Sequence, residues 1–110
     1  MTDRDRELLL LAAKAAGHKL KFVPLAGSEL PVAEDLGCSW NPLIDDGTAL
    51  RLAVNLRLDL TQMTTGGGQQ VLRVLGPQSI DRTYEIAEDD PYAATRRAIV
   101  RAAAELGRSS

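Results

Sequence analysis

CSWNPLIDDGTALRLAV, residues 38–54, contains the chain's only cysteine and only tryptophan, followed by two aspartates and a glycine. A carboxylate at Asp45 or Asp46 can accept hydrogen bonds from the unpaired amides that open a helix. After these aspartates, apolar residues recur at the spacing of the buried face of an amphipathic helix. The stretch therefore predicts that a loop passes into a helix over residues 46–56, with an inner stripe of Ala49, Leu52, Ala53 and Leu56.

Trp40, just before this helix, has two interpretations. In the structural one, Trp40 is an apolar plug where the loop returns to the core, and Asn41 belongs to a turn. In the binding one, Trp40, Asn41, Asp45 and Asp46 line a pocket, where the indole stacks on a flat ligand and the carboxylates accept hydrogen bonds. Because aspartates at such positions are commonly caps, the pattern favours the structural interpretation and leaves a binding role open.

The N-terminal third begins with a helix and a strand. Thr2 caps the helix and Gly17 ends it. Residues 18–23, HKLKFV, alternate apolar and basic side chains, which is typical of a strand with one wet face. Residues 24–39 contain two prolines and two glycines without a sustained period, so we expect a long ordered loop there.

Three strand-like runs follow the central helix, at residues 58–63, 71–75 and 79–88. Between the first two, the sequence TTGGGQQ at residues 64–70 predicts a hairpin. The three glycines could also form an anion-binding nest, although a flexible hairpin tip is favoured. Consecutive strands of this kind are expected to pair as an antiparallel meander.

The last helix is capped by Asp90 and opened by Pro91, and Gly107 is expected to end it. Residues 108–110 are expected to form a frayed tail. The predicted fold is therefore α+β, in the order α-β-α-β-β-β-α. An antiparallel sheet of three or four strands packs with three helices in one domain that covers residues 1–110.

The composition sets limits on partners and on location. The net charge of −2 gives no general attraction to nucleic acid, and one cysteine cannot form an internal disulfide. The N-terminal segment has acidic residues where a signal peptide has basic ones, and no apolar run approaches the roughly 20 residues that span a bilayer. We therefore expect a cytoplasmic protein with no membrane or nucleic-acid partner.

The aromatic content predicts a thin core. Only four residues are aromatic, so Leu, Val, Ile and Ala must fill most of the interior, and each of them buries less area than a ring. A shared interface is one remedy for a thin core. We therefore expect a homo-oligomer, most simply a twofold dimer.

Motifs of catalysis and metal binding are missing from the sequence. It has no G-x-S-x-G, H-E-x-x-H or P-loop pattern, and the flanks of Cys38 and His18 do not mark a catalytic cysteine. Neither DDG at residues 45–47 nor EDD at residues 88–90 has the spacing of a calcium loop. We therefore expect no enzymatic activity, no catalytic residue, no metal and no cofactor.

The last helix carries a row of arginines. Arg97, Arg101 and Arg108 recur at helical spacing along one side, and Arg96 lies beside them. Such a row is either a solvated face or a grip for phosphates and acidic partners, because each guanidinium offers a fixed fork of donors. If the chain holds a phosphorylated ligand, Arg96, Arg97 or Arg101 should contact it.

Two blocks, WNPLIDDGTALRLAVNL at residues 40–56 and DDPYAATRRAIVRAAAELG at residues 89–107, carry a resemblance. The chain resembles small bacteriophage proteins with the phage ABA sandwich domain over essentially its whole length. The resemblance implies an α-β-α sandwich and a phage or prophage origin, and it implies no chemistry because the domain has no assigned activity. Thr48 stands where the family usually has Asp, which argues against a third carboxylate with a role there.

These features together predict a non-enzymatic phage or prophage accessory protein that acts by stoichiometric binding in the host cytosol. It would be a counter-defence protein that sequesters a nucleotide immune signal, or another phosphorylated small molecule, or blocks a host defence protein. Two other classes stay open, namely a structural or assembly accessory without a small ligand, and a small metal-dependent nucleotide-processing enzyme. The candidate ligand-binding residues are Trp40, Asn41, Asp45, Asp46, Arg96, Arg97 and Arg101.

Overall fold

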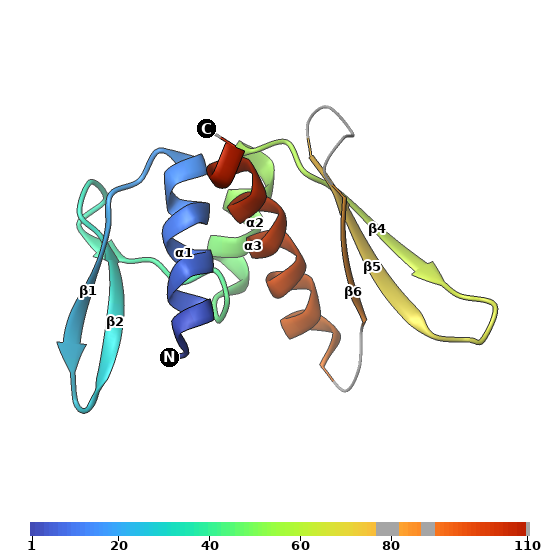
Figure 1. Cartoon of the computed structure of the whole chain (residues 1–110), viewed down its shortest axis with the longest axis horizontal. Helices are drawn as coiled ribbons and strands as arrows, with labels where there is room; N and C mark the ends of the chain where they lie inside the picture. The colour runs from blue at the N-terminus through green and yellow to red at the C-terminus, as the bar shows by residue number, and fades with distance from the viewer. Residues whose placement is uncertain (77–81, 87–89, 110) are drawn as a thin grey trace.

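The computed structural model describes residues 1–76, 82–86 and 90–109. Within them it has three helices and two antiparallel sheets of three strands each, which confirms the predicted α+β class (Figure 1). The elements are α1 (Asp3–Ala16), β1 (Leu20–Leu25), β2 (Ser28–Ala33), β3 (Cys38–Ser39), α2 (Asp46–Asn55), β4 (Asp59–Thr64), β5 (Gln70–Leu75), β6 (Arg82–Ile86) and α3 (Pro91–Ser109).

The helices form the centre of the molecule (Figure 1). Helices α1 and α3 lie side by side and run in the same direction, and α2 packs against α3. The sheet β1-β2-β3 lies beside α1, while the sheet β4-β5-β6 covers α3 from the other side. The order of layers is therefore sheet, helices, sheet, where the resemblance implied a sheet between helices.

The expected long loop at residues 24–39 is wrong, because most of it is strand. β1 and β2 form a hairpin that turns at Ala26 and Gly27, both with positive φ, 45° and 81°. The carbonyl oxygen of Pro31, in β2, accepts a hydrogen bond from the Trp40 amide at 2.9 Å, just beyond β3. Proline has no N–H to donate but keeps its carbonyl acceptor, so Pro31 is compatible with this ladder.

Gly107 does not end the last helix. The expected frayed tail is also wrong for residues 108 and 109, which belong to the helix. α3 continues to Ser109, and Gly107 is buried inside it against the backbone of Leu11 in α1. Nη1 of Arg108 lies 3.3 Å from Oε1 of Glu7, which holds this end of α3 to α1. Ser110 lies outside the described residues. A glycine at position 107 therefore serves close helix packing rather than termination.

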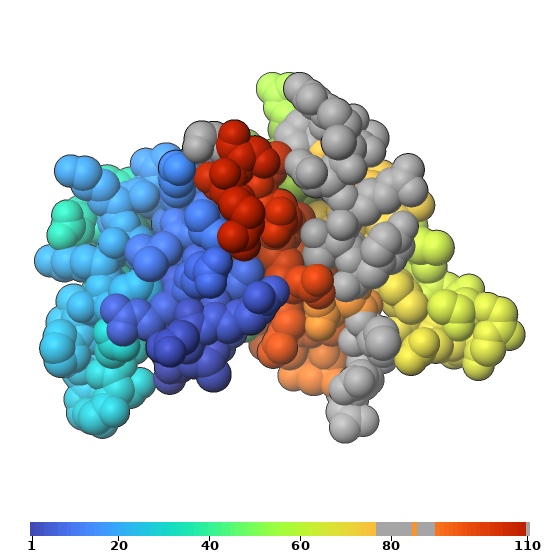
Figure 2. Space-filling view, in the orientation of Figure 1, coloured from blue at the N-terminus to red at the C-terminus, as the bar shows by residue number. Residues whose placement is uncertain are grey.

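Other local predictions are confirmed. Thr2 accepts a hydrogen bond from the Asp5 amide at 3.1 Å, and Gly17 has φ of 80° at the end of α1. Asp90 accepts from two amides at the start of α3. The three glycines lie at the tip of the β4–β5 hairpin, which projects from the helical body in Figure 2. Of the expected strand at residues 79–88, β6 is observed, and the rest lies outside the described residues.

The core consists mainly of small side chains from the three helices. Most of α3's buried face is alanine, which lets α1 and α3 approach closely. Sheet β1-β2-β3 joins this core through Phe22, whose ring lies 4.6 Å from the guanidinium carbon of Arg6 in α1. The larger buried side chains of the cluster are Leu8, Leu9, Trp40, Leu52, Leu58, Val74, Ile99 and Val100.

Candidate functional site

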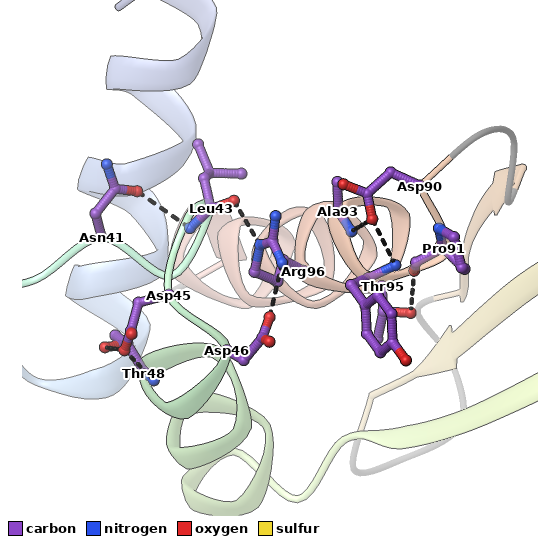
Figure 3. A network of polar contacts seen from close by, with 11 residues as sticks. Asn41, Leu43, Asp45, Asp46, Thr48, Asp90, Pro91, Ala93, Thr95 and Arg96 are labelled. Atoms are coloured by element: carbon purple, nitrogen blue, oxygen red, sulfur yellow. Dashed lines mark hydrogen bonds and ion pairs between the residues drawn. The ribbon is translucent and has the colours of Figure 1, made fainter.

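Arg96 ties the start of α2 to α3 (Figure 3). Its Nε donates to the carbonyl oxygen of Leu43 at 2.8 Å, and its Nη1 lies 2.7 Å from Oδ1 of Asp46. The Arg96 side chain is 17% exposed whereas that of Asp46 is 72% exposed, so the guanidinium lies mostly inside the protein. Arg96 therefore holds α2 and α3 together.

Asp45 and Asn41 shape the turn that leads into α2 (Figure 3). The Asp45 carboxylate accepts from both the hydroxyl and the amide of Thr48, the latter at 2.8 Å. These two donors hold the pKa of Asp45 below its ordinary value of 3.8. Oδ1 of Asn41 accepts from the Leu43 amide at 3.1 Å. Each of these side chains is used by the backbone around it, as the structural interpretation predicts.

Trp40 is only 6% exposed, which confirms the prediction that it is largely buried. Its ring and the His18 ring pack in a T-shaped arrangement, with centroids 5.6 Å apart and an angle of 64° between the planes. Because so little of the indole is accessible, Trp40 does not offer an open face on which a base could stack.

A cavity of about 320 Å³ adjoins Trp40 and is here named the tryptophan pocket. Nδ1 of His18 lies 2.8 Å from the Asp35 carboxylate, and this bond and the Lys19 amide lower the pKa of Asp35. His18 and the exposed Cys38 line the same pocket, but no hydrogen bond joins them in the described part of the chain. The lining residues are Ala16, His18, Leu36, Cys38, Ser39, Trp40, Thr48, Arg51, Leu52 and Asn55.

A second cavity, of about 560 Å³, lies where the first turns of α1 face α3 and β6. We name it the arginine cleft, because it contains Arg97 and Arg101 from the predicted row together with Arg4 from α1. Thr2, Asp5, Leu8 and Glu85 complete its lining. The structure thus brings together two of the seven predicted site residues here and leaves the other five around the start of α2.

The charges of the arginine cleft are unevenly paired. Nη1 of Arg101 forms an ion pair with Oε2 of Glu85. Arg4 and Arg97 are exposed, and neither makes an ion pair within the described ranges. Since the cleft holds three arginines and two carboxylates, its lining carries a surplus of positive charge. Arg108, the third arginine of the row, lies outside the cleft and pairs with Glu7 and Glu105.

Sequence reasoning missed Arg4, because nothing local connects the first turn of one helix with the middle of another. The contact depends on the packing of α1 against α3, whose residues lie about as far apart in sequence as the chain allows. The acidic partners of Arg96, Arg101 and Arg108 are likewise on other elements or on other turns. Spacing along α3 therefore indicated which arginines share a side and could not indicate which are neutralised.

Two further properties bear on the class of site. Among residues 1–76, 82–86 and 90–109, no three His, Cys, Asp or Glu side chains lie close enough together to hold a metal ion. In the same ranges, no helix has both the length and the apolar character that crossing a membrane requires.

The chain was also compared with known proteins. No protein-family model, curated protein or solved structure matches it.

Proposed function

We propose that the chain is a non-enzymatic binding protein that captures a small phosphorylated ligand, one molecule per cleft, in the arginine cleft. In a phage or prophage setting, such a protein would act against host defence by sequestering a nucleotide signal. The observation that carries the proposal is the convergence of Arg4 and Arg97, both exposed and without an ion pair among the described residues, on a cleft that Arg101 also lines.

The size and chemistry of the cleft support a nucleotide-sized ligand. Its volume of about 560 Å³ falls within the range of small-molecule sites. Guanidinium groups offer paired donors that match the oxygens of a phosphate. Arg4 and Arg97 come from two different helices, so a phosphate bound to both would be held by α1 and by α3.

The carboxylates of the cleft refine the ligand class. Asp5 and Glu85 would repel a bare polyanion, whereas they can accept hydrogen bonds from a hydroxyl or amino group. A ligand with both a phosphate and a sugar or base therefore fits better than inorganic phosphate. Binding, rather than catalysis, is favoured because Asp45 and Asp46 are already engaged in a cap and an ion pair.

Calorimetric titration of the purified chain with ADP, a cyclic dinucleotide and inorganic phosphate tests this proposal. We expect one nucleotide per cleft, weaker binding of phosphate alone, and affinity that falls as salt rises. Arg97→Gln and Arg4→Gln should each weaken nucleotide binding at least tenfold, since a charged hydrogen bond contributes about 1.5–3 kcal/mol. Arg108→Gln is the matched control, because Arg108 lies on the same helix outside the cleft.

Equal losses from Arg97→Gln and Arg108→Gln would contradict the proposal, because they would reflect overall charge rather than the cleft. So would the absence of binding by every nucleotide. Retained affinity in a folded Arg4→Gln/Arg97→Gln double variant would place the ligand elsewhere.

A further inference from the structure

Helix α2 carries an exposed apolar ridge that the proposed binding function does not use. Leu50 and Val54 lie one turn apart on the face opposite the buried Ala49 and Leu52, and they are 64% and 66% exposed. Ile44, just before the helix, is 74% exposed. Two large apolar side chains this exposed, one turn apart on the same helix face, form the kind of patch that marks an interaction surface.

Opposite charges stand at the two ends of this ridge. Asp46 opens α2 on the same side as Leu50 and Val54, at the i, i+4, i+8 positions of one helix stripe. Arg57 follows the helix, is exposed, and has no ion pair within the described residues. The order along this part of the chain is therefore acidic, apolar, apolar and basic, with Arg57 three residues after Val54 and just beyond the end of α2.

We propose that α2 packs antiparallel on α2 of a second copy of this chain, about a twofold axis that passes between Leu50 and Val54. In this register Leu50 contacts Val54 of the second copy, and Asp46 meets Arg57 of the second copy. One axis near residue 52 gives both pairings. Leu50 and Val54 lie at equal distances on either side of residue 52, and Asp46 and Arg57 lie at nearly equal distances, since the helix rises by about 1.5 Å per residue.

The chemistry of the ridge favours a second copy over an unrelated partner. A twofold interface must be self-complementary, and this stripe is, because reversing it exchanges its acid with its base. Oδ1 of Asp46 is bonded to Arg96, and the carboxylate has a second oxygen for another guanidinium. The pair would have apolar contacts in the middle and charges at the rim, the usual arrangement of an interface.

This proposal is independent of the arginine cleft. The cleft is lined by α1, β6 and α3, and none of the ridge residues contributes to it. Failure of one proposal therefore leaves the other standing.

Sedimentation equilibrium of the full chain is the test. The wild-type chain should form a dimer, and Leu50→Lys and Val54→Lys should each raise the dimer dissociation constant at least tenfold. Leu25→Lys is the matched control, since Leu25 is 57% exposed at the β1–β2 turn, away from the ridge, and should leave the dimer unchanged. A wild-type chain that stays monomeric, or a Leu50→Lys dimer of wild-type affinity, would overturn the proposal.

The charges provide a second and sharper test. Asp46→Lys and Arg57→Asp should each weaken the dimer, because each places like charges together at both ends of the interface. An equimolar mixture of these two variants should dimerise again, since every end then joins opposite charges. Circular dichroism checks that each variant is folded. If the folded variants do not recover in the mixture, the antiparallel register is wrong.

Discussion

Gly107 of α3 lies so close to Leu11 of α1 that a Cβ at position 107 would overlap the Leu11 carbonyl oxygen. Gly107→Ala should therefore destabilise the fold by about 1–3 kcal/mol or more, because the two backbones must separate. In an isolated helix the same change would instead be favourable. Urea unfolding measures the difference. Gly66→Ala, where a Cβ meets open space, should stay within about 0.5 kcal/mol of wild type. A neutral Gly107→Ala would contradict the close approach.

Trp40→Ala should cost about 3–5 kcal/mol, because it removes the largest ring of the core and leaves a cavity between the β3 end and α2. Tyr92→Ala is the control, since Tyr92 is also aromatic but 71% exposed. Chemical unfolding and intrinsic fluorescence are the measurements. An emission maximum typical of indole in water, with unchanged stability on mutation of Trp40, would reject its place in the core.

Asp45 should make stability depend on pH. Its pKa is lower in the folded chain than its ordinary value of 3.8, because the Thr48 hydroxyl and amide donate to the carboxylate. The contribution is therefore complete above the unfolded pKa and is lost as the pH falls through the folded pKa. Asp45→Asn keeps an acceptor at the cap but removes the charge, so it should flatten the decline of melting temperature between about pH 5 and pH 3. Asp45→Ala should lower the melting temperature at neutral pH as well. Equal slopes in wild type and Asp45→Asn would contradict the assignment.

Replacing Arg96 by alanine should destabilise the fold, whereas the same change at its neighbour Arg97 should not. Arg96→Ala removes the bond to the Leu43 carbonyl and the ion pair with Asp46, so it should cost about 1–3 kcal/mol. Arg97→Ala should stay within about 0.5 kcal/mol, because Arg97 is exposed and without an ion pair in the described chain. Thermal unfolding of both variants compares them directly. When nucleotide binding is measured instead, the proposal for the arginine cleft requires Arg97→Ala to have a larger effect than Arg96→Ala.

The starts of the helices were predictable because their signals are local. The side chains of Thr2, Asp45 and Asp90 accept hydrogen bonds from amides two or three residues away. These bonds need only short-range geometry, which residue type and spacing indicate. The paired runs around the three glycines were predictable for the same reason.

Features that depend on distant partners were not predictable in this way. The β1–β2 hairpin was hidden because Pro24 and Pro31 interrupt the strand pattern and its turn uses Ala26 with positive φ. Gly107 carries the local signal of a helix end, and only the packing of α1 shows why a side chain is excluded there. The seven candidate site residues fell into two separate groups for a similar reason. Arg96 and Arg97 are adjacent in sequence but on different sides of α3, and their partners come from other elements.

The packing of α1 against α3 also dictates an order of events during synthesis on the ribosome. Leu11 emerges early, yet its contact is Gly107, so the helical core cannot close until nearly all of the described chain has left the exit tunnel. Until then α1 exposes Leu8 and Leu9, which are buried in the finished fold. Contacts between such distant segments also slow folding, because a long loop must close before they form. The apolar face of α1 therefore stays open to other contacts until the last helix has been made.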